Sequence, residues 1–416
     1  LALRRSQSPC QVWHEETMAS KESNDGSLTF VSYNVLSPEL SDPKTFPENT
    51  ADECAGEKRL PRILEALARH VARGAVIALQ EVSISWLGAL QLFFEAHDYH
   101  YSSTLYGGWY SGYMGVGLAY PRKVYALENF EISRIADTKR WPKDPNDGAA
   151  QRRRGASKTA AATATGLVAY SKSYLRNLFD PLFLVAGLFA GGAADAPSSS
   201  SSSASSSNQG CAEQTFYESK KRANQAILLR LRRRSDGATY CVCTYHNPCA
   251  IHCRPIISLH ACLVAEKAQA FAGTDPLVLL GDFNMTPESG GYELLTTGSL
   301  AANHPEFPTL PSWDSWRPTL RAMKSAYAEA HPEGQEPETT NKAVRLIGKW
   351  GAKANAFSGT LDYVFILSGE SASFSVLEVL ALPDKAVLEA RPSWPTGSIP
   401  SDHLEVGATL RYETKR

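Results

Sequence analysis

The sequence predicts a layered α/β architecture, and three consecutive segments near the start of the chain indicate it. Residues 28–36 form a run rich in apolar and β-branched residues, which is typical of a buried strand. Apolar residues then recur at helical spacing over residues 58–73, and residues 76–79 form a second apolar run. A strand, a helix and a strand in this order predict helices packed against a sheet.

Later segments extend this pattern. Gly74 predicts the end of the first helix, because glycine readily adopts the left-handed conformation that often follows a helix. Residues 83–97 and 257–272 are predicted to be helical, the second from the spacing of its apolar residues. Further strands are predicted at residues 226–231, 240–245, 277–280, 360–367, 374–382 and 405–412.

Composition limits the class of protein. The chain has 416 residues, of which 43% are hydrophobic, so it can bury a sizeable core. The formal net charge is −1, which gives no overall basic field, so any binding site for a polyanion must be local. The eight cysteines are irregularly spaced, which favours reduced thiols in an intracellular, cytoplasmic or nuclear protein over a disulfide framework.

Two segments are predicted to lie outside the folded core. Residues 1–26 are polar and are predicted to be disordered, so the folded domain is expected to span residues 27–413. Residues 142–215 interrupt this domain with an insertion rich in arginine, alanine and serine. Such a composition buries too little apolar surface to offset chain entropy, so most of the insertion is predicted to be disordered.

One stretch of the insertion is strongly apolar. Residues 181–194 are too few to span a bilayer, so we expect no stable membrane insertion. Residues 174–194 are instead a candidate for contact with a protein or a membrane surface. The alternative is a locally packed hairpin or helix.

Five short polar motifs lie where the predicted strands begin or end. Taken singly, each is weak, because an asparagine after a strand is usually a turn former. Glu81 closes a wholly apolar strand, where a metal or a cationic neighbour would relieve the cost of burying its charge. Asp282 and Asn284 alternate with Phe283, so both can face one cleft. The motifs are Tyr33-Asn34, Gln80-Glu81, Gly281-Asp282-Phe283-Asn284, Leu361-Asp362-Tyr363 and Ser401-Asp402-His403.

Together these motifs supply the groups that hydrolysis of a phosphoester requires. Those groups are hard oxygen ligands for Mg²⁺, a group that orients or deprotonates water, and a donor to the phosphoryl oxygens. The motifs contain few soft ligands, which favours Mg²⁺ or Mn²⁺ over zinc. A zinc site is a less favoured alternative, because the candidate ligands lack two separated Cys-x-x-Cys pairs. Those candidates are Cys241, Cys243, His246, Cys249, His252 and Cys253.

In this order, the five motifs resemble those of the endonuclease/exonuclease/phosphatase superfamily, over residues 27–140 and 216–412. The resemblance implies a four-layer α/β sandwich, in which two facing mixed β-sheets are flanked by helices as in deoxyribonuclease I. Residues 281–287 and 400–404 are most similar to the deadenylase/nocturnin/angel-like branch. The chain departs from that branch in lacking the leucine-rich repeats of large deadenylases and in carrying the insertion.

The resemblance also implies roles for the motif residues. Asn34, Glu81 and Asp402 would hold the metal ion, with Glu81 as the principal ligand. Asp282 would align or deprotonate the attacking water. Asn284 would contact the scissile phosphate.

Four further roles follow from the same resemblance or lie close to its motifs. Asp362 would pair with His403 and orient the imidazole toward a phosphoryl oxygen. His246 lies where relatives carry a second phosphate-facing residue, and a structural histidine is the alternative. Asn224 and Tyr292 are candidates for contact with the substrate.

The function implied is Mg²⁺-dependent hydrolysis of a phosphodiester, with RNA as the favoured substrate and a 3′-exonuclease or deadenylase as the favoured type. A small-molecule phosphatase acting on an inositol phosphate, a nucleotide cofactor or a lipid headgroup is the alternative enzyme. A catalytically inactive binding module in an RNA-processing complex is the alternative outside enzymes. Basic residues between Lys220 and Arg234 could contact a nucleic-acid backbone, but Arg230 and Arg232 alternate with leucines, which favours a solvated strand face.

Overall fold

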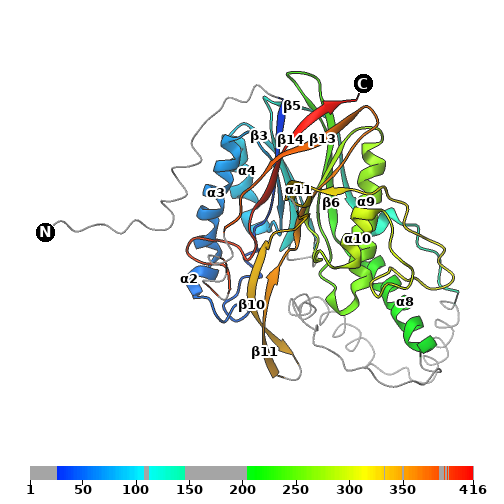
Figure 1. Cartoon of the computed structure of the whole chain (residues 1–416). Coiled ribbons are helices and arrows are strands. Elements are labelled where there is room, and N and C mark those ends of the chain that lie inside the picture. The colour runs from blue at the N-terminus through cyan, green and yellow to red at the C-terminus, as the bar shows by residue number, and fades with distance from the viewer. Residues whose placement is uncertain are drawn as a thin grey trace, which may run out of the picture.

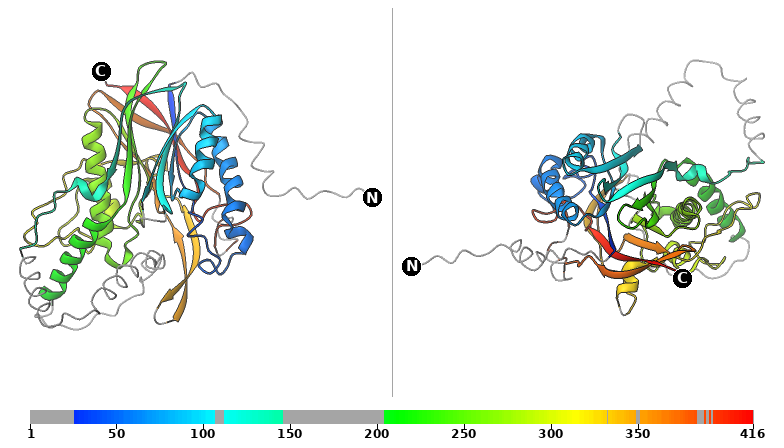
Figure 2. Two further views of the ribbon diagram at one scale, coloured as in Figure 1. Left: turned by 180° about the vertical axis from the view of Figure 1, so that it is seen from behind. Right: turned by 90° about the horizontal axis from the view of Figure 1, so that it is seen from above.

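Two six-stranded β-sheets lie face to face between outer layers of helices (Figures 1 and 2). The computed structural model describes residues 26–106, 112–145, 204–331, 333–348, 351–383, 388, 391 and 393–415. This arrangement confirms the four-layer α/β sandwich that the motifs implied.

The first sheet has the strand order β13-β14-β1-β2-β4-β3. Only β1 and β2 are parallel, and every other neighbouring pair in this sheet is antiparallel. Its strands are β1 (Ser27–Asn34), β2 (Val76–Gln80), β3 (Tyr99–Tyr106), β4 (Met114–Pro121), β13 (Ala372–Val379) and β14 (Val406–Thr414).

The second sheet has the order β5-β6-β7-β8-β12-β9. Here too there is one parallel pair, β7 and β8. Its strands are β5 (Tyr125–Arg134), β6 (Gln225–Arg233), β7 (Thr239–His246), β8 (Leu277–Asp282), β9 (Lys324–Ser325) and β12 (Asp362–Leu367). Each sheet is therefore mixed and mostly antiparallel, as expected.

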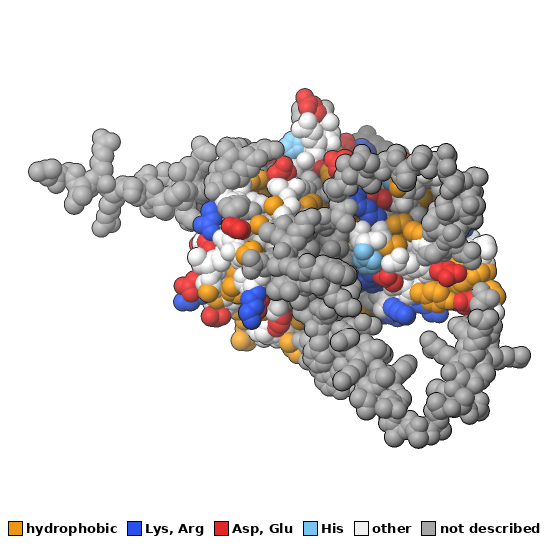
Figure 3. Space-filling view, turned by 90° about the horizontal axis from the view of Figure 1, so that it is seen from below, with side chains coloured by type: hydrophobic (Ala, Val, Ile, Leu, Met, Phe, Trp, Pro, Cys, Tyr) orange, Lys and Arg blue, Asp and Glu red, His pale blue; other side chains and the backbone are white. Residues whose placement is uncertain are grey.

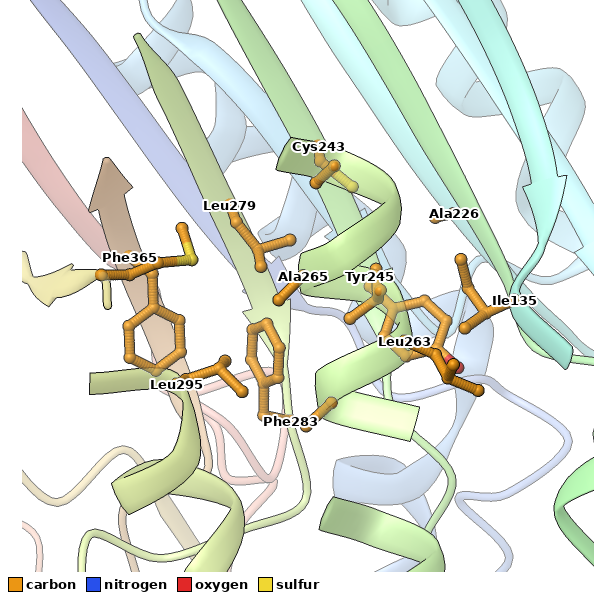
Figure 4. Packing of buried hydrophobic residues seen from close by; sticks show 14 of the residues in the cluster. Ile135, Ala226, Cys243, Tyr245, Leu263, Ala265, Leu279, Phe283, Leu295 and Phe365 are labelled. Carbon is orange, nitrogen blue, oxygen red and sulfur yellow. The ribbon is translucent and has the colours of Figure 1, made fainter. Parts of the chain in front are cut away.

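Helices cover the outer face of each sheet. The helices α3 (Gly56–Ala72) and α4 (Ile84–Ala96) pack on the first sheet, and α9 (Arg254–Ala272) and α10 (Gly290–Thr297) on the second. In Figure 4, α9 places Leu263 and Ala265 against Cys243, Leu279 and neighbouring strand residues. The shorter helices are α2 (Ala51–Cys54), α11 (Ala326–Ala330) and the 3₁₀ turns η1 (Ile135–Thr138) and η2 (Ile251–Cys253).

Three apolar layers hold the sandwich together. One lies between the sheets and includes Phe30, Val242 and Val278, which are all fully buried. The other two lie between each sheet and its helices. Because β1, β2, β7 and β8 are covered on both faces, their sequences are nearly continuous apolar runs, and this is why they were recognisable.

The predicted helix and strand positions agree closely with the structure, and Gly74 follows α3 with φ 68° as expected. The strands β3, β4, β5 and β9 were not predicted, and neither were the two strands at residues 340–348 and 351–359. One boundary also differs: α8 (Ala204–Lys221) begins inside the segment 142–215, so its last part is helical and not disordered. Residues 146–203, with the apolar stretch 181–194, lie outside the described residues.

A two-stranded ribbon projects from one end of the sandwich (Figure 1). It consists of β10 (Thr340–Gly348) and β11 (Gly351–Gly359), paired antiparallel. Within the part of the chain that the structure describes, no helix is both long and apolar enough to span a bilayer.

Candidate active site

Strand register brings the predicted motifs to one end of the two sheets. In the parallel pair β1–β2, Asn34 lies opposite Gln80, which directly precedes Glu81. In the parallel pair β7–β8, His246 lies opposite Asp282, and the antiparallel strand β12 adds Asp362 opposite the same aspartate. Because parallel strands end at the same edge, residues far apart in the sequence become neighbours.

Asn34 links the two sheets through its side chain. Its Nδ2 donates to Glu81 Oε1 at 3.2 Å and to Asp282 Oδ2 at 2.9 Å. Its Oδ1 accepts from the backbone N–H of Leu36 at 3.0 Å, while Glu81 Oε2 accepts from the backbone N–H of Ser37 at 3.0 Å. The loop after β1 thus holds the amide and the carboxylate in a fixed relative orientation.

The backbone at this end is in uncommon conformations. Glu81 has φ 58° and Asn284 has φ 50°, values in the left-handed region that non-glycine residues rarely adopt. Gly281 has φ 153°, and a Cβ there would lie 1.9 Å from the backbone oxygen of Tyr245 on β7. Only glycine permits this approach of β8 to β7. Such strain gathers at functional sites, where surrounding contacts hold it in place.

Asp362 and His403 form a buried pair. His403 Nδ1 lies 2.8 Å from Asp362 Oδ2, and that oxygen also accepts from the hydroxyl of Thr339 at 2.7 Å. Burial by itself lowers the pKa of His403, but the charges of Asp362, Asp402 and Asp282 outweigh it and raise the pKa to about 9. The imidazole is therefore cationic at neutral pH, and the expected pairing of these two residues is present.

Asp402 contacts a lysine that sequence reasoning missed. Lys342 Nζ donates to Asp402 Oδ2 at 3.1 Å, and both side chains are largely buried, with 11% and 4% exposed. Burial raises the pKa of Asp402, but Lys342 and His403 outweigh it and hold that pKa below its ordinary value. The sequence could have indicated Lys342 by its position directly after Thr339-Thr340-Asn341, because that segment is similar to the deadenylase/nocturnin/angel-like branch.

His246 and Asn284 complete the cluster. His246 Nε2 lies 3.5 Å from Asp282 Oδ2, and its Nδ1 is buried without a hydrogen-bond partner. Asn284 donates through Nδ2 to the backbone oxygen of Asn247 at 2.8 Å, and its N–H donates to Asp282 Oδ1 at 2.9 Å. Both residues line one pocket with Glu81.

The donor set fits a divalent cation. Among the residues that the structure describes, two groups have ligand atoms within 4.8 Å of one another. Glu81, His246 and Asp282 form one, and Asp282, Asp362 and His403 form the other. The cluster contains four carboxylates, and the cationic side chains in contact with them are those of Lys342 and His403. Oδ1 of Asp362 and Oδ1 of Asp402 are buried without hydrogen-bond partners. Buried acceptors in excess of donors are the pattern that a hard cation relieves.

Asp402 differs from the other two predicted metal ligands. Asn34 and Glu81 touch one another, and Glu81 belongs to the first group of possible ligands. Asp402 belongs to neither group, and its Oδ2 accepts from Lys342. Its free Oδ1 is the atom through which it would reach a cation.

The two candidates for substrate contact lie in different places. Asn224 donates from Nδ2 to the backbone oxygen of His246 at 2.9 Å, so it borders the cluster. Tyr292 is not brought to the cluster: its ring packs against Tyr363 and Phe365, and its hydroxyl donates to Glu336 at 2.7 Å. The aromatic core outside the second sheet accounts for this position.

Neither the zinc alternative nor the basic segment gains support from the structure. Cys241 and Cys243 are buried in β7, and no group of possible metal ligands among the described residues includes a cysteine. Arg230 pairs with Asp275 at 2.8 Å and Arg232 with Glu128 at 2.7 Å. Seen from the end at which β10 and β11 project, the described surface carries scattered basic and acidic side chains (Figure 3).

Comparison with known proteins agrees with this geometry. A family model described as Endonuclease/Exonuclease/phosphatase family matches residues 31–403. The chain is similar to 2′,5′-phosphodiesterase 12 of Bos taurus, with 28% identity over 141 residues, 33% of this chain and 20% of that protein. It is also similar to the CCR4-Not complex 3′-5′-exoribonuclease subunit Ccr4 of Phaeosphaeria nodorum, with 30% identity over 141 residues, 33% of this chain and 21% of that protein. The aligned part spans about one fifth of these curated relatives.

Two solved structures share the fold. ANGEL2, described as a 2′,3′-cyclic phosphatase and solved with adenosine-2′,3′-vanadate, has a TM-score of 0.57 and 17% identity, covering 92% of this chain and 95% of that chain. The human Nocturnin catalytic domain, solved with a sulfate anion, has a TM-score of 0.52 and 16% identity, covering 93% and 95%. The named relatives and structures all fall in the branch that the motifs resemble.

Proposed function

Because the chain belongs to the endonuclease/exonuclease/phosphatase family, we propose that it is a Mg²⁺-dependent hydrolase of phosphodiester bonds that acts on RNA. The observation that carries the proposal is the convergence of Asn34, Glu81, Asp282 and His403 from four separate strand ends. Asp282 is central to it, because its Oδ2 lies within 3.8 Å of nitrogens on Asn34, His246 and His403.

The chemistry follows from the groups present. A bound Mg²⁺ would polarise a phosphoryl oxygen and offset the charge that develops on the phosphate. Asp282 accepts a proton from the attacking water, whose oxygen bonds to phosphorus as the bond to the leaving oxygen breaks. The leaving oxygen takes up one proton, so that one water is consumed. His403, cationic because of Asp362, and Asn284 donate to the phosphoryl oxygens.

RNA is the favoured substrate because of the relatives, and not because of the geometry of the site. The relatives named above include an exoribonuclease subunit and a 2′,5′-phosphodiesterase, whose names describe cleavage of nucleotide linkages. A 3′-exonuclease of the deadenylase type is the form we propose. The filled set of polar positions supports an enzyme over an inactive binding module.

The test is hydrolysis of 5′-labelled oligo(A) by the purified chain with and without Mg²⁺, beside inositol phosphates and NADPH. Glu81→Gln and Asp282→Asn are each expected to lower kcat by about 10²–10⁴-fold while the protein stays folded. The matched control is Glu336→Gln, which alters a partly buried carboxylate that accepts from Tyr292 outside the cluster, and it should leave kcat unchanged.

The outcomes separate the alternatives. Turnover of inositol phosphate or NADPH but not of oligo(A) would replace RNA by a small-molecule substrate. Full activity in Asp282→Asn would remove the proposed mechanism. Binding of oligo(A) without turnover of any substrate would favour the binding module.

A further inference from the structure

We propose that Lys342 is a catalytic residue that binds a non-bridging oxygen of the scissile phosphate, and that Asp402 holds its ammonium group in position for this contact. This assignment rests on the proposed function, because it names the group that meets the phosphate in the same site. It concerns a side chain that none of the five motifs contains.

The backbone carrying Lys342 is fastened to the catalytic loop. Asn341 donates its N–H to the backbone oxygen of Asp402 at 3.1 Å, and Thr340 forms an isolated β-bridge with His403. The side chain of Asn341 donates to the backbone oxygen of Leu388 at 3.0 Å. The base of the ribbon β10–β11 is thus part of the active site, and Lys342 cannot move independently of Asp402.

The ammonium group faces the cluster and has donors to spare. Lys342 lines the same pocket as Glu81, Asp282 and Asn284, and its side chain is 11% exposed. An ammonium group has three N–H donors, and among the described residues Nζ makes one hydrogen bond, to Asp402. The remaining donors can serve an anion that enters the pocket.

Asp402 can hold Lys342 and a cation at the same time. Its Oδ2 accepts from Lys342, whereas its Oδ1 is buried without a partner. The two oxygens of Asp362 differ in the same way: Oδ2 lies against His403, and Oδ1 has no hydrogen-bond partner. Each aspartate therefore keeps one oxygen on a cationic side chain and leaves the other for a further cation.

The different partners of its two oxygens explain why Asp402, the fourth carboxylate of the cluster, needs Lys342 beside it. Without Lys342, Asp402 would add a buried negative charge beside Asp282 and would repel the anionic substrate. With it, the site presents a fixed ammonium group to the phosphate. Lysine acts here as a point charge on an enclosed stem, and the larger planar fork of arginine is a poor replacement.

The test compares Lys342→Met with the wild-type chain by calorimetric binding of inorganic phosphate in the presence of Mg²⁺. We expect phosphate affinity to fall by about tenfold or more, because one charge-assisted hydrogen bond is lost. Binding of Mg²⁺ alone, measured the same way, should be retained or tightened, because a competing positive charge has been removed. The matched control is Lys267→Met, whose lysine pairs with Glu131 at 2.7 Å and lies in a different network.

Phosphate affinity within twofold of wild type would overturn the assignment. If Lys342→Met does not fold, Lys342→Gln is measured in its place, because its amide can still donate to Asp402 while the positive charge is removed, and the same loss of phosphate affinity is expected of it. Loss of phosphate binding would support Lys342 even if no tested substrate is hydrolysed. The two proposals therefore fail separately.

Discussion

Two buried lysine–aspartate pairs lie in different parts of this molecule and have different surroundings. Lys139 Nζ lies 2.6 Å from Asp314 Oδ2, under the rings of Trp141 and Trp316 at 4.6 and 6.0 Å. The other oxygen of Asp314 accepts from the backbone N–H of Trp316 at 3.1 Å. This pair is closed: both carboxylate oxygens have partners and aromatic rings cover the ammonium.

Lys342 and Asp402 form a buried pair that keeps free hydrogen-bonding atoms, and we call it the open pair. Their distance is longer, at 3.1 Å, and one oxygen of Asp402 has no partner. The pair lines a pocket with four other site residues, Glu81, His246, Asp282 and Asn284. Burial of an ion pair is therefore not by itself a sign of function. What distinguishes the Lys342–Asp402 pair is its unsatisfied hydrogen-bonding capacity beside a pocket.

The largest expected difference is in stability. Lys139→Met leaves Asp314 buried and unpaired, and we expect a loss of about 3–5 kcal/mol in the free energy of unfolding. Lys342→Met should lose clearly less, because Asp402 borders a pocket that ions and water can enter. Urea unfolding of both variants measures this, and equal losses would contradict the distinction between a closed and an open pair.

The second largest effect is expected in the pH dependence of folding stability, through His403 in the active-site cluster. Because the pKa of His403 is raised to about 9 in the folded state, its contribution to stability is fully present below its ordinary pKa of 6.5. It is lost as pH rises through about 9, and amounts to about 3 kcal/mol. Asp362→Asn should flatten this decline in metal-free urea unfolding between pH 6 and pH 9.5. An unchanged decline would show that another group causes it.

His260, a buried histidine outside the cluster, should change stability with pH in the direction opposite to His403. His260 is buried with its ring nitrogens 3.1 Å from the hydroxyl of Tyr245 and 3.1 Å from the backbone oxygen of Ser219, and burial lowers its pKa to about 3. Its stabilisation is present above pH 6.5 and is lost as pH falls toward 3, by about 2 kcal/mol at pH 5. His260→Gln should be less sensitive to acid than wild type between pH 7 and pH 5. Equal acid sensitivity of the variant and the wild type would show that other residues cause the loss of stability at low pH.

The smallest effect is expected at the partly exposed pairs of β6. Arg232 and Glu128 are 2.7 Å apart with 45% and 34% of their side chains exposed. Arg232→Gln should change the free energy of unfolding by less than about 1 kcal/mol. It should also leave the affinity for oligo(A) unchanged, and a loss of affinity in a filter-binding titration would restore the basic segment as an RNA contact.

The predictions from sequence succeeded where local pattern and function coincide. Strands ended by Asn34, Glu81 and Asp282 were readable because a polar or charged side chain at the end of a buried strand needs a partner. β3 and β5 were missed because they are edge strands in which polar and apolar residues mix, whereas β4 is buried throughout and two glycines interrupt its apolar run. Tyr292 was predicted to contact the substrate because it follows the Gly281–Asn284 motif in the sequence, but it is partly buried and its ring packs against Tyr363.

The sequence by itself determined the layered fold, the motif residues of the cluster and the family, because these depend on periodicity and on short motifs that a single strand end can carry. Only the tertiary structure decided which of those residues touch. The partners of Asn34, the pairing of Lys342 with Asp402 and the raised pKa of His403 arise from contacts across two sheets. Such contacts depend on strand register and burial, which link positions hundreds of residues apart and leave no local pattern at either end.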